Sequence, residues 1–329
     1  VAKGVFGPMG GAEMDLIRVL PSINRLFDAT MATIQASPEL EEACSANGIT
    51  LLRPGNDWAL STDPVSTIMD SGRGTASNAW ASCDGLEEAL GSVTALHLVS
   101  GDGSLPLLDH VPEDLPVHLH MLEPHRGLYE ETLHRRVDGS PKRNLALTKA
   151  ALSRARRRDQ GLVSSLISRQ GSMVSGNSTF SAHRAKEVYG VEAGILWPCV
   201  DTEEFPADSS GDPENPYPGE DEYVTSIGRA SFAKGTWETI SMLSGTDLSL
   251  AHVGGGEEGA IASLEAHAES CGVGLWVAPR LTSPELVSLM RSSRAIVSMA
   301  HKESFGLTPI EAFAVGTPAL FVDEGGFRD

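Results

Sequence analysis

Short apolar runs alternate with helical stretches along this chain, and that alternation restricts the fold more than any other feature. The first series of apolar runs comprises Val1–Phe6, Ile49–Arg53, Thr94–Ser100, Val117–Leu122, Met173–Gly176 and Ile195–Val200. The second comprises Tyr223–Ile227, Leu248–Val253, Val273–Val277, Ala295–Met299 and Ala319–Val322. Helical stretches such as Glu87–Leu90 and Lys142–Ser168 lie between them. Strands that alternate with helices indicate an α/β fold with parallel sheets.

The segment between the two series has a different composition. It carries four prolines among acidic residues and serines, at Pro206, Pro213, Pro216 and Pro218, as an exposed linker does. A chain of 329 residues is long enough for two cores. We therefore expect an N-terminal doubly wound domain at 1–205, a linker at 206–221 and a second such domain at 222–329. The two would face each other across a cleft, with ligands at the carboxyl ends of the strands.

Charge and cysteine content narrow the class of protein. A net charge of −19 argues against a general nucleic-acid binder, which needs a cationic face. The four cysteines (Cys44, Cys83, Cys199 and Cys271) show no CxxC spacing, which favours reduced thiols in a cytoplasmic enzyme over disulfides or a zinc site. No apolar run approaches the ~20 residues that cross a bilayer, and no signal peptide is visible.

Two glycine-containing turns lead into helices. The first, with Gly10 and Gly11, follows the first apolar run, and the second carries Gly306. The N-terminus of a helix presents free backbone N–H groups that suit a phosphate. For Gly10 and Gly11 the alternative is a tight turn with nothing bound.

In the second turn, we expect Thr308 to be the N-cap and Pro309 the first helical residue. Glu311 then has capping-box spacing from Thr308, so it could simply cap its own helix. Glu303, eight residues before Glu311, has no such explanation.

Two cations and a glycine run follow strands of the second series. Arg229 and Lys234 come directly after Tyr223–Ile227 and could hold a diphosphate, or they could be ordinary surface charges. Gly254, the first of three consecutive glycines, indicates close backbone packing or a plain turn.

Glu303 and Glu311 bracket the sequence Phe-Gly-Leu-Thr-Pro, and this arrangement resembles the double-glutamate motif of the retaining nucleotide-sugar glycosyltransferases of family four, which have the GT-B fold. The Gly-Gly-Ala-Glu sequence that begins at Gly10 is similar to the family's N-terminal motif. The run from Pro198 to Phe205 resembles its inter-domain signature.

The resemblance implies a role for each of these residues. Glu303 would bind the donor sugar and Glu311 the nucleotide ribose. The diphosphate would be held by Arg229, Lys234 and the backbone N–H groups of Gly306 and Leu307, and the turn with Gly10 and Gly11 would face it across the cleft. Gly254 would pack near the donor, and Phe305 is a further donor-binding candidate. Arg280 occupies the place where family members contact the base.

The resemblance also implies that a nucleoside-diphosphate sugar is the co-substrate and that no metal or other cofactor takes part. Consistent with this, the sequence has no Asp-x-Asp metal motif, and Asp102 stands alone between glycines. Family members continue with further helices beyond the point where this sequence ends. We therefore expect the second domain to be incomplete.

The first domain of the family carries a histidine before a Pro-x-Arg-x-x-Tyr run. Alignment on Pro124, Arg126 and Tyr129 puts Leu122 at that place. His120 lies two residues upstream on the same strand face and is our candidate. The alternatives are that Glu123 substitutes, that the enzyme manages without the group, or that His120 is an ordinary packed histidine.

The stretch from Arg135 to Arg158 reverses the charge of the chain. It carries nine cations against the single acid Asp138. Such a block is usually a solvated helix face. In the domain expected to hold the acceptor, it could instead contact an anionic membrane or a lipid-linked acceptor, so we also expect a location at the inner face of a membrane.

The resemblance implies a retaining glycosyltransferase that moves a sugar from a nucleoside-diphosphate sugar to an acceptor hydroxyl of a glycan or lipid-linked acceptor. A GT-B epimerase or phosphorylase acting on sugar phosphates is one alternative. An inactive nucleotide-sugar-binding remnant is the other.

Overall fold

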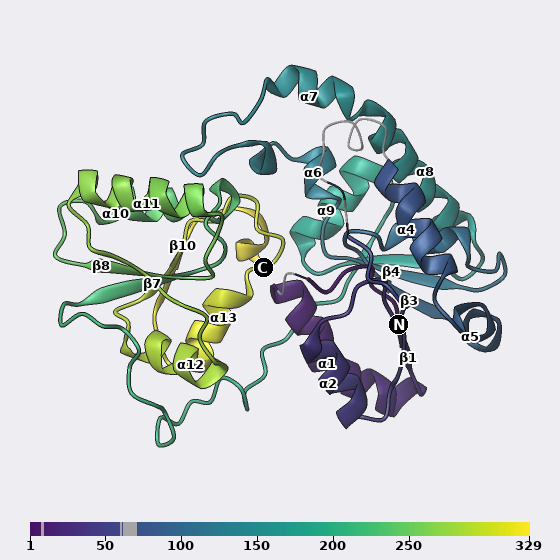
Figure 1. Cartoon of the computed structure of the whole chain (residues 1–329), viewed down its shortest axis with the longest axis horizontal. Helices are drawn as coiled ribbons and strands as arrows, with labels where there is room; N and C mark the ends of the chain where they lie inside the picture. Colours follow the sequence, from purple (N-terminus) through teal and green to yellow (C-terminus); the bar gives the residue numbers. More distant parts are fainter. Residues whose placement is uncertain (8–9, 60, 62–70) are drawn as a thin grey trace. The chain divides into compact units, whose positions relative to one another are not determined.

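The computed structural model describes residues 1–7, 10–59, 61 and 71–329, which pack into two units (Figure 1). The first unit comprises Val1–Tyr129 and Ala146–Pro198, and the second comprises Glu130–Leu145 and Cys199–Asp329. The division therefore falls at Pro198 where we expected residue 205. Glu130–Leu145, which we expected in the first domain, packs with the second unit. Pro8 and Met9 of the first glycine turn lie outside the described residues.

The first unit is built on parallel strands. Four of them, in the order β3-β4-β5-β6, are Leu96–Val99, Val117–Met121, Met173–Gly176 and Gly194–Ile195. Two more, β1 and β2, are Thr30–Ala32 and Thr50–Leu52. Ala2 bridges Ala32 of β1 on one side and Leu98 of β3 on the other, so the start of the chain lies between the two groups. The expected strand Val1–Phe6 is present only as isolated bridges.

The helices of the first unit are α1 Gly11–Phe27, α2 Pro38–Ala46, α4 Ser71–Ala81, α5 Leu86–Ser92, α6 Arg126–Tyr129, α8 Ser153–Ser168 and α9 Thr179–Tyr189, with η1 Leu105–Asp109. The stretch expected as one helix over Lys142–Ser168 is divided. Helix α7 (Leu145–Ala151) ends before Leu152, and α8 begins after it. The main core of the unit is built around Trp80, Leu98, Leu107 and Leu119, all fully buried.

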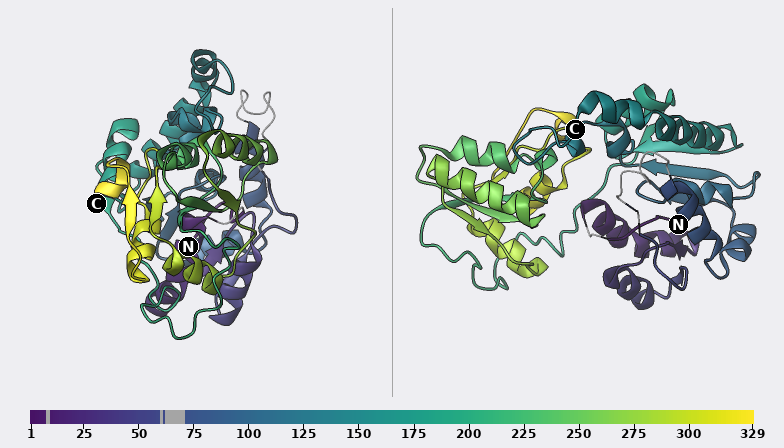
Figure 2. Two further views of the ribbon diagram at one scale, coloured as in Figure 1. Left: turned by 90° about the vertical axis from the view of Figure 1, so that its left-hand side faces the viewer. Right: turned by 45° about the horizontal axis from the view of Figure 1, so that its top comes forward.

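The second unit is a five-stranded parallel sheet in the order β11-β10-β7-β8-β9. Its strands are β7 Tyr223–Ile227, β8 Ser249–Val253, β9 Leu275–Val277, β10 Ile296–Ser298 and β11 Ala319–Phe321. Helices α10 Thr236–Leu243 and α11 Glu258–Cys271 cover one face, and α12 Ser283–Ser292 and α13 Leu307–Ala314 cover the other (Figures 1 and 2). The short helices η3 Phe232–Lys234 and η4 Gly325–Arg328 lie in loops. The expected α/β class with parallel sheets is thus confirmed.

Strand order reverses direction once in each unit. In the second unit the chain runs from β7 outward through β8 to β9, and then returns to place β10 on the other side of β7. In the first, it runs from the initial bridge at Ala2 through β1 to β2, and then returns to place β3 on the other side. Ligands of such sheets bind outside the carboxyl ends of the strands at this switch point.

The segment Glu130–Leu145 belongs to the second unit through packing and charge. Val137 is buried in the core of that unit beside residues of α10 and α11. The guanidinium of Arg135 lies 5.8 Å from the ring centroid of Phe232 in η3. The short helix η2 (Thr132–His134) directly precedes Arg135 in this segment.

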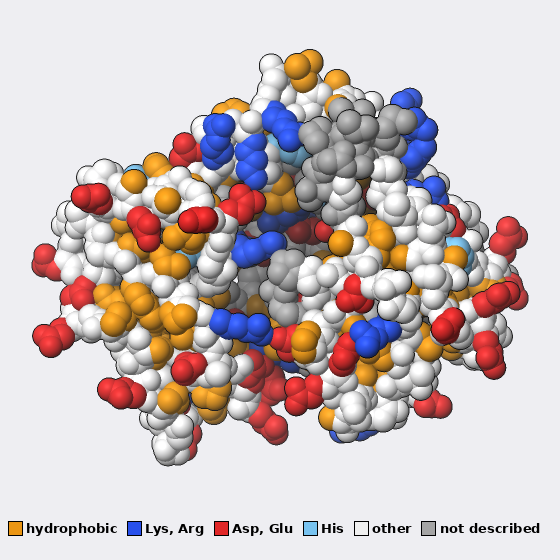
Figure 3. All heavy atoms as spheres, viewed as in Figure 1, with side chains coloured by type: hydrophobic (Ala, Val, Ile, Leu, Met, Phe, Trp, Pro, Cys, Tyr) orange, Lys and Arg blue, Asp and Glu red, His pale blue; other side chains and the backbone are white. Residues whose placement is uncertain are grey.

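Carboxylates are distributed over the visible surfaces of both units, as the net charge of −19 requires (Figure 3). Among the described residues, no helix combines the length and the apolar character needed to cross a bilayer.

Candidate functional site

Two of the predicted site residues meet at the switch point of the second unit. Lys234 ends η3 in the loop after β7, and Glu303 lies in the loop after β10. The Nζ of Lys234 is 2.7 Å from Oε2 of Glu303. The ion pair therefore joins the two loops where a ligand of this sheet would bind.

The surroundings of this pair make it more than a surface contact. The Glu303 side chain is 16% exposed and the Lys234 side chain 35%. Arg229, in the same loop as Lys234, is exposed, and its side chain makes no hydrogen bond or ion pair with the rest of the described chain. The loops thus supply one cation already fixed by a carboxylate and one free to meet an anion.

Glycines allow the two adjacent loops to approach closely. Gly254, after β8, has φ +123°, and a Cβ there would lie 2.6 Å from the carbonyl oxygen of Gly228. A Cβ on Gly228 would in turn lie 3.1 Å from the aliphatic stem of Lys234. The close packing expected at Gly254 is therefore found, and it helps to fix the stem of Lys234.

Helix α13 begins earlier than expected. Its N-cap is Gly306, with φ +97°, and Leu307 is the first helical residue, so the prediction of Thr308 as N-cap and Pro309 as first residue was wrong. A side chain at position 306 would collide with Phe327, because a Cβ would lie 2.3 Å from its ring. The glycine allows this earlier start, and the missing N–H of Pro309 falls in the first turn, where it costs no helical bond.

The start of α13 at Leu307 excludes the alternative that Glu311 forms a capping box with Thr308. A capping box joins the N-cap residue to the third helical residue, which here are Gly306 and Pro309. Glu311, half-buried in the second turn, is not part of one. The neighbouring helix α12 shows the true motif, in which Thr282 and Glu285 bond reciprocally. Thr282 is the N-cap there.

The remaining donor-side candidates also lie in loops or at helix starts. Gly10, with extended backbone, is the N-cap of α1 and Gly11 its first residue, and no side chain caps this helix start. Arg280 is exposed after β9. Phe305 and Leu307 are half-buried on either side of Gly306.

His120 is 6% exposed and lies in the first sheet beside two other histidines. Its Nδ1 is 3.0 Å from Oγ of Ser175, which also lies 2.8 Å from Nε2 of His118. Nδ1 of His97 is 2.9 Å from Nδ1 of His118. Burial, and secondarily the charge of His118, lower the pKa of His120 to about 4. These contacts favour the packed, hydrogen-bonded alternative for His120.

Two side-chain contacts, one in each unit, were not predicted from the sequence. The first is an ion pair of 2.6 Å between Lys302 and the buried Glu130, whose partners lie far apart in the sequence. The second is a contact of 3.0 Å between Nε2 of His125 and Oδ1 of Asp102. The sequence signal for the second was the isolated Asp102 between two glycines.

The basic stretch is divided between the two units. Its first four cations, from Arg135 to Arg143, lie on the second unit, and its last five, from Lys149 to Arg158, lie on the first. The expectation that the whole block belongs to the first domain was therefore wrong. The reason is the packing of Val137 into the second core.

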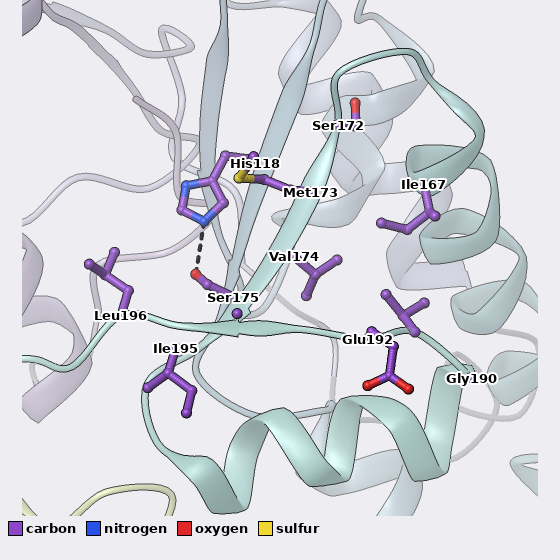
Figure 4. Close-up of a pocket in the computed structure, with 12 residues that line it drawn as sticks. His118, Ile167, Ser172, Met173, Val174, Ser175, Gly190, Glu192, Ile195 and Leu196 are labelled. Atoms are coloured by element: carbon purple, nitrogen blue, oxygen red, sulfur yellow. Dashed lines mark hydrogen bonds between the residues drawn. The ribbon is translucent and has the colours of Figure 1, made fainter.

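A cavity of about 750 Å³ opens beside the edge strand β6 of the first unit (Figure 4). It is lined by His118, Ser175 and Glu192 among mostly apolar side chains, including Met173 and Ile195. None of the predicted site residues lines it. Among the described residues, no group of histidine, cysteine and carboxylate side chains is arranged to hold a metal ion.

Comparison with known proteins agrees with this architecture. Residues 211–329 match the family model described as "Glycosyl transferases group 1". No curated protein matches the sequence. Similar solved structures include a glycosyltransferase from Rickettsia africae, with 14% identity and a TM-score of 0.61, over 99% of this chain and 79% of that one.

Two further structures are similar over 99% of this chain. Sucrose-phosphate synthase from Thermosynechococcus elongatus has 14% identity and a TM-score of 0.70, over 82% of its own chain. Anabaena HepE in complex with UDP and glucose has 14% identity and a TM-score of 0.58, over 81% of its own chain. The chain therefore has the fold of the GT-B glycosyltransferases, and over residues 211–329 it matches the glycosyl transferases group 1.

Proposed function

We propose that this protein is a retaining glycosyltransferase that uses a nucleoside-diphosphate sugar. The observation that carries the proposal is the Lys234–Glu303 pair at the switch point of the second sheet, beside the uncapped start of α13. The group 1 family match over the same unit supports sugar transfer. The similar HepE structure contains UDP and glucose, which supports a UDP-sugar as the donor to test first.

In the proposed reaction, the bond between the anomeric carbon and the diphosphate oxygen breaks, and negative charge grows on the departing diphosphate. Lys234 and Arg229 stabilise that charge, together with the backbone N–H groups of Gly306 and Leu307. Because fixed cations and N–H dipoles neutralise the leaving group, the step needs no metal ion.

Each carboxylate has a distinct role in this proposal. Glu303, fixed by Lys234, accepts hydrogen bonds from hydroxyls of the donor sugar. Glu311, which does not serve as a cap, binds the ribose. The acceptor oxygen attacks the anomeric carbon on the face that the diphosphate leaves, and the acceptor proton passes to the diphosphate oxygen. The anomeric configuration is thereby retained.

A thermal-shift screen with nucleoside diphosphates and their sugars tests donor binding first. UDP or another nucleoside diphosphate should raise the melting temperature, and the matching sugar nucleotide should be hydrolysed slowly. NMR of the product then identifies the anomer. An inverted product would overturn retention, release of sugar 1-phosphate would indicate a phosphorylase, and binding without turnover would indicate an inactive remnant.

We further propose that the acceptor is presented at an anionic membrane surface contacted by α7 and α8. Lys149, Arg154 and Arg157 are exposed there, and none pairs with a carboxylate among the described residues. Leu147, on the preceding turns, is 70% exposed. Arg154 lies in the first turn of α8, where the helix dipole disfavours a cation, so an external anion would relieve that cost.

Co-sedimentation with liposomes tests this contact. The parent should bind vesicles containing anionic lipid and release them as salt rises, because the attraction is screened over about 8–10 Å at 0.1–0.15 M. A variant with Lys149, Arg154 and Arg157 changed to Gln should lose binding. A control with the exposed Lys186 and Arg294, which have carboxylate partners, changed to Gln should retain it. Equal binding of all three proteins would show that the cations of α7 and α8 are solvated and do not contact the lipid.

A further inference from the structure

Asp102 and His125 meet at the carboxyl edge of the first sheet. Asp102 lies in the loop after β3 and His125 in the loop after the neighbouring strand β4. Their contact is 3.0 Å between Nε2 and Oδ1, with the aspartate side chain 49% and the histidine 41% exposed. An exposed pair of this kind contributes little to stability, so a substitution in it should leave the fold intact.

The loop that carries Asp102 is held rigidly from three sides. The hydroxyl of Ser104, which is fully buried, accepts a hydrogen bond of 2.9 Å from the backbone N–H of Gly4. The indole of Trp80 donates to the carbonyl oxygen of Gly103 at 2.8 Å. The backbone is also in tight contact with the start of the chain, since a Cβ on Gly4 would lie 2.1 Å from the carbonyl oxygen of Asp102.

A carboxylate that is exposed on a rigid, buried backbone is preorganised, because its position has been fixed before any ligand arrives. The place is also significant. Ala2 lies between β1 and β3, so the loop after β3 borders the switch point of the first sheet. Sheets of this class bind their ligands in that crevice. Gly10, the N-cap of α1, follows the initial segment of the chain, which lies beside β3.

The two side chains offer complementary hydrogen bonding. Desolvation opposes protonation of His125, but the hydrogen bond and charge of Asp102, with the charge of Asp159, outweigh it and raise the pKa of His125. Asp159 comes from α8 and accepts hydrogen bonds from the hydroxyls of Tyr129 and Tyr189. The loops thus present an acceptor-only carboxylate next to an imidazole that donates.

We propose that Asp102 and His125 form a polyol-binding subsite of the first unit, which selects the acceptor through a pair of neighbouring hydroxyls. One hydroxyl donates to the Asp102 carboxylate, and the other accepts from Nδ1–H of His125, whose Nε2–H already donates to Asp102. This inference rests on the proposed function for the reaction that the subsite serves. The geometry of the pair itself does not depend on it.

NMR of the full chain tests the subsite directly. The imidazole signals of His125, assigned through their loss in His125→Gln, are followed while glucose, myo-inositol or inorganic phosphate is added. At least one polyol should shift the signals saturably, phosphate should not, and Asp102→Asn should abolish the response. A response to phosphate alone, or to none of the three, would overturn the proposal.

A second measurement uses transfer. With UDP-glucose as donor and octyl glucoside as acceptor probe, Asp102→Asn should raise the acceptor KM by about tenfold or more, the loss of one charged hydrogen bond. Donor hydrolysis without acceptor should stay within about twofold, because the donor contacts are unchanged. Asp109→Asn is the matched control, since Asp109 forms a similarly exposed pair with Arg73 elsewhere in the unit.

The outcomes separate the two proposals. If the parent neither binds nor hydrolyses any nucleotide sugar, the proposed function fails, and the NMR titration still decides whether the pair binds polyols. If the parent transfers sugar and Asp102→Asn behaves like Asp109→Asn, the subsite assignment fails while the function stands.

Discussion

Replacing Lys234 by Gln removes the cation that lies 2.7 Å from the Glu303 carboxylate. Glu303 is 16% exposed, so it would lose this ion pair in a largely desolvated place. A hydrogen bond between charged groups is typically worth about 1.5–3 kcal/mol. Because Lys234 is 35% exposed, solvent screening puts the loss at or just below the lower end of that range. We therefore expect a decrease of about 1–1.5 kcal/mol in the free energy of unfolding.

The effect on turnover should be larger than this. Charge on the diphosphate grows as the glycosidic bond breaks, so Lys234 contributes more in the transition state than in the bound ground state. Loss of one such contact typically lowers the rate by about 10²–10³. Initial rates at several donor concentrations should show this fall in kcat, with a smaller rise in the donor KM.

The double substitution decides what Lys234 does. If both side chains contact the donor, Lys234→Gln with Glu303→Gln should be no faster than the slower single variant. If Glu303→Gln restores turnover to Lys234→Gln, the lysine serves only to neutralise the glutamate, and our reasoning is refuted. Lys186→Gln is the control, because Lys186 forms an ion pair with Glu192 in the first unit and is not a candidate site residue.

Three further predictions concern other parts of the chain. Glu311→Gln should weaken donor binding in calorimetry yet leave unfolding within about 1 kcal/mol, because Glu311 is not a capping residue; a lower melting temperature with unchanged donor affinity would contradict this. Val137→Ala should cost about 2 kcal/mol in denaturant unfolding, whereas Leu147→Ala, at an exposed site, should cost little; equal costs would show that the segment Glu130–Leu145 does not pack as described. Burial lowers the pKa of His97 to about 3 and that of His120 to about 4. Below pH 6.5 the unfolded chain therefore binds more protons than the folded chain. As the pH decreases, the free energy of unfolding should decrease by about 1.4 kcal/mol per pH unit per histidine until each folded pKa is reached. Thermal unfolding from pH 7 to pH 4 measures that slope, and an unchanged slope in His120→Gln would exclude this cause.

The sequence predicted the second sheet well, because the hydrophobic pattern of a buried parallel strand is local, whereas in the first unit it missed β1 and overlapped β6 only at Ile195. All five strands of the second sheet lie within the predicted runs. The start of α13 was predicted less well. Thr308 and Pro309 have the right propensities for an N-cap and a first helical residue, but Gly306 takes the cap because only glycine fits against Phe327. That contact comes from a later loop and leaves no local signal.

Candidate residues that belong to a sequence motif could be predicted, whereas residues brought together only by tertiary contacts could not. The pattern around Lys234 and Glu303 identified both residues, and the structure adds that they form an ion pair. His120 was chosen by strand alternation, which gives the face of a strand but not its burial. The contact between His125 and Asp102 joins two loops after neighbouring strands. Only strand order, which the sequence does not specify, brings those loops together.

The second unit is assembled from two stretches that are separated in sequence by the return of the chain to the first unit. Cleavage within the proline-rich linker would therefore leave the two products joined through Glu130–Leu145. A fragment of residues 199–329 would lack the apolar side chain of Val137 and the carboxylate partner of Lys302. A synthetic peptide of residues 130–145 should complement that fragment in trans, as the excised part of a split protein does. The part of the chain that matches the family, 211–329, is thus smaller than the unit that folds.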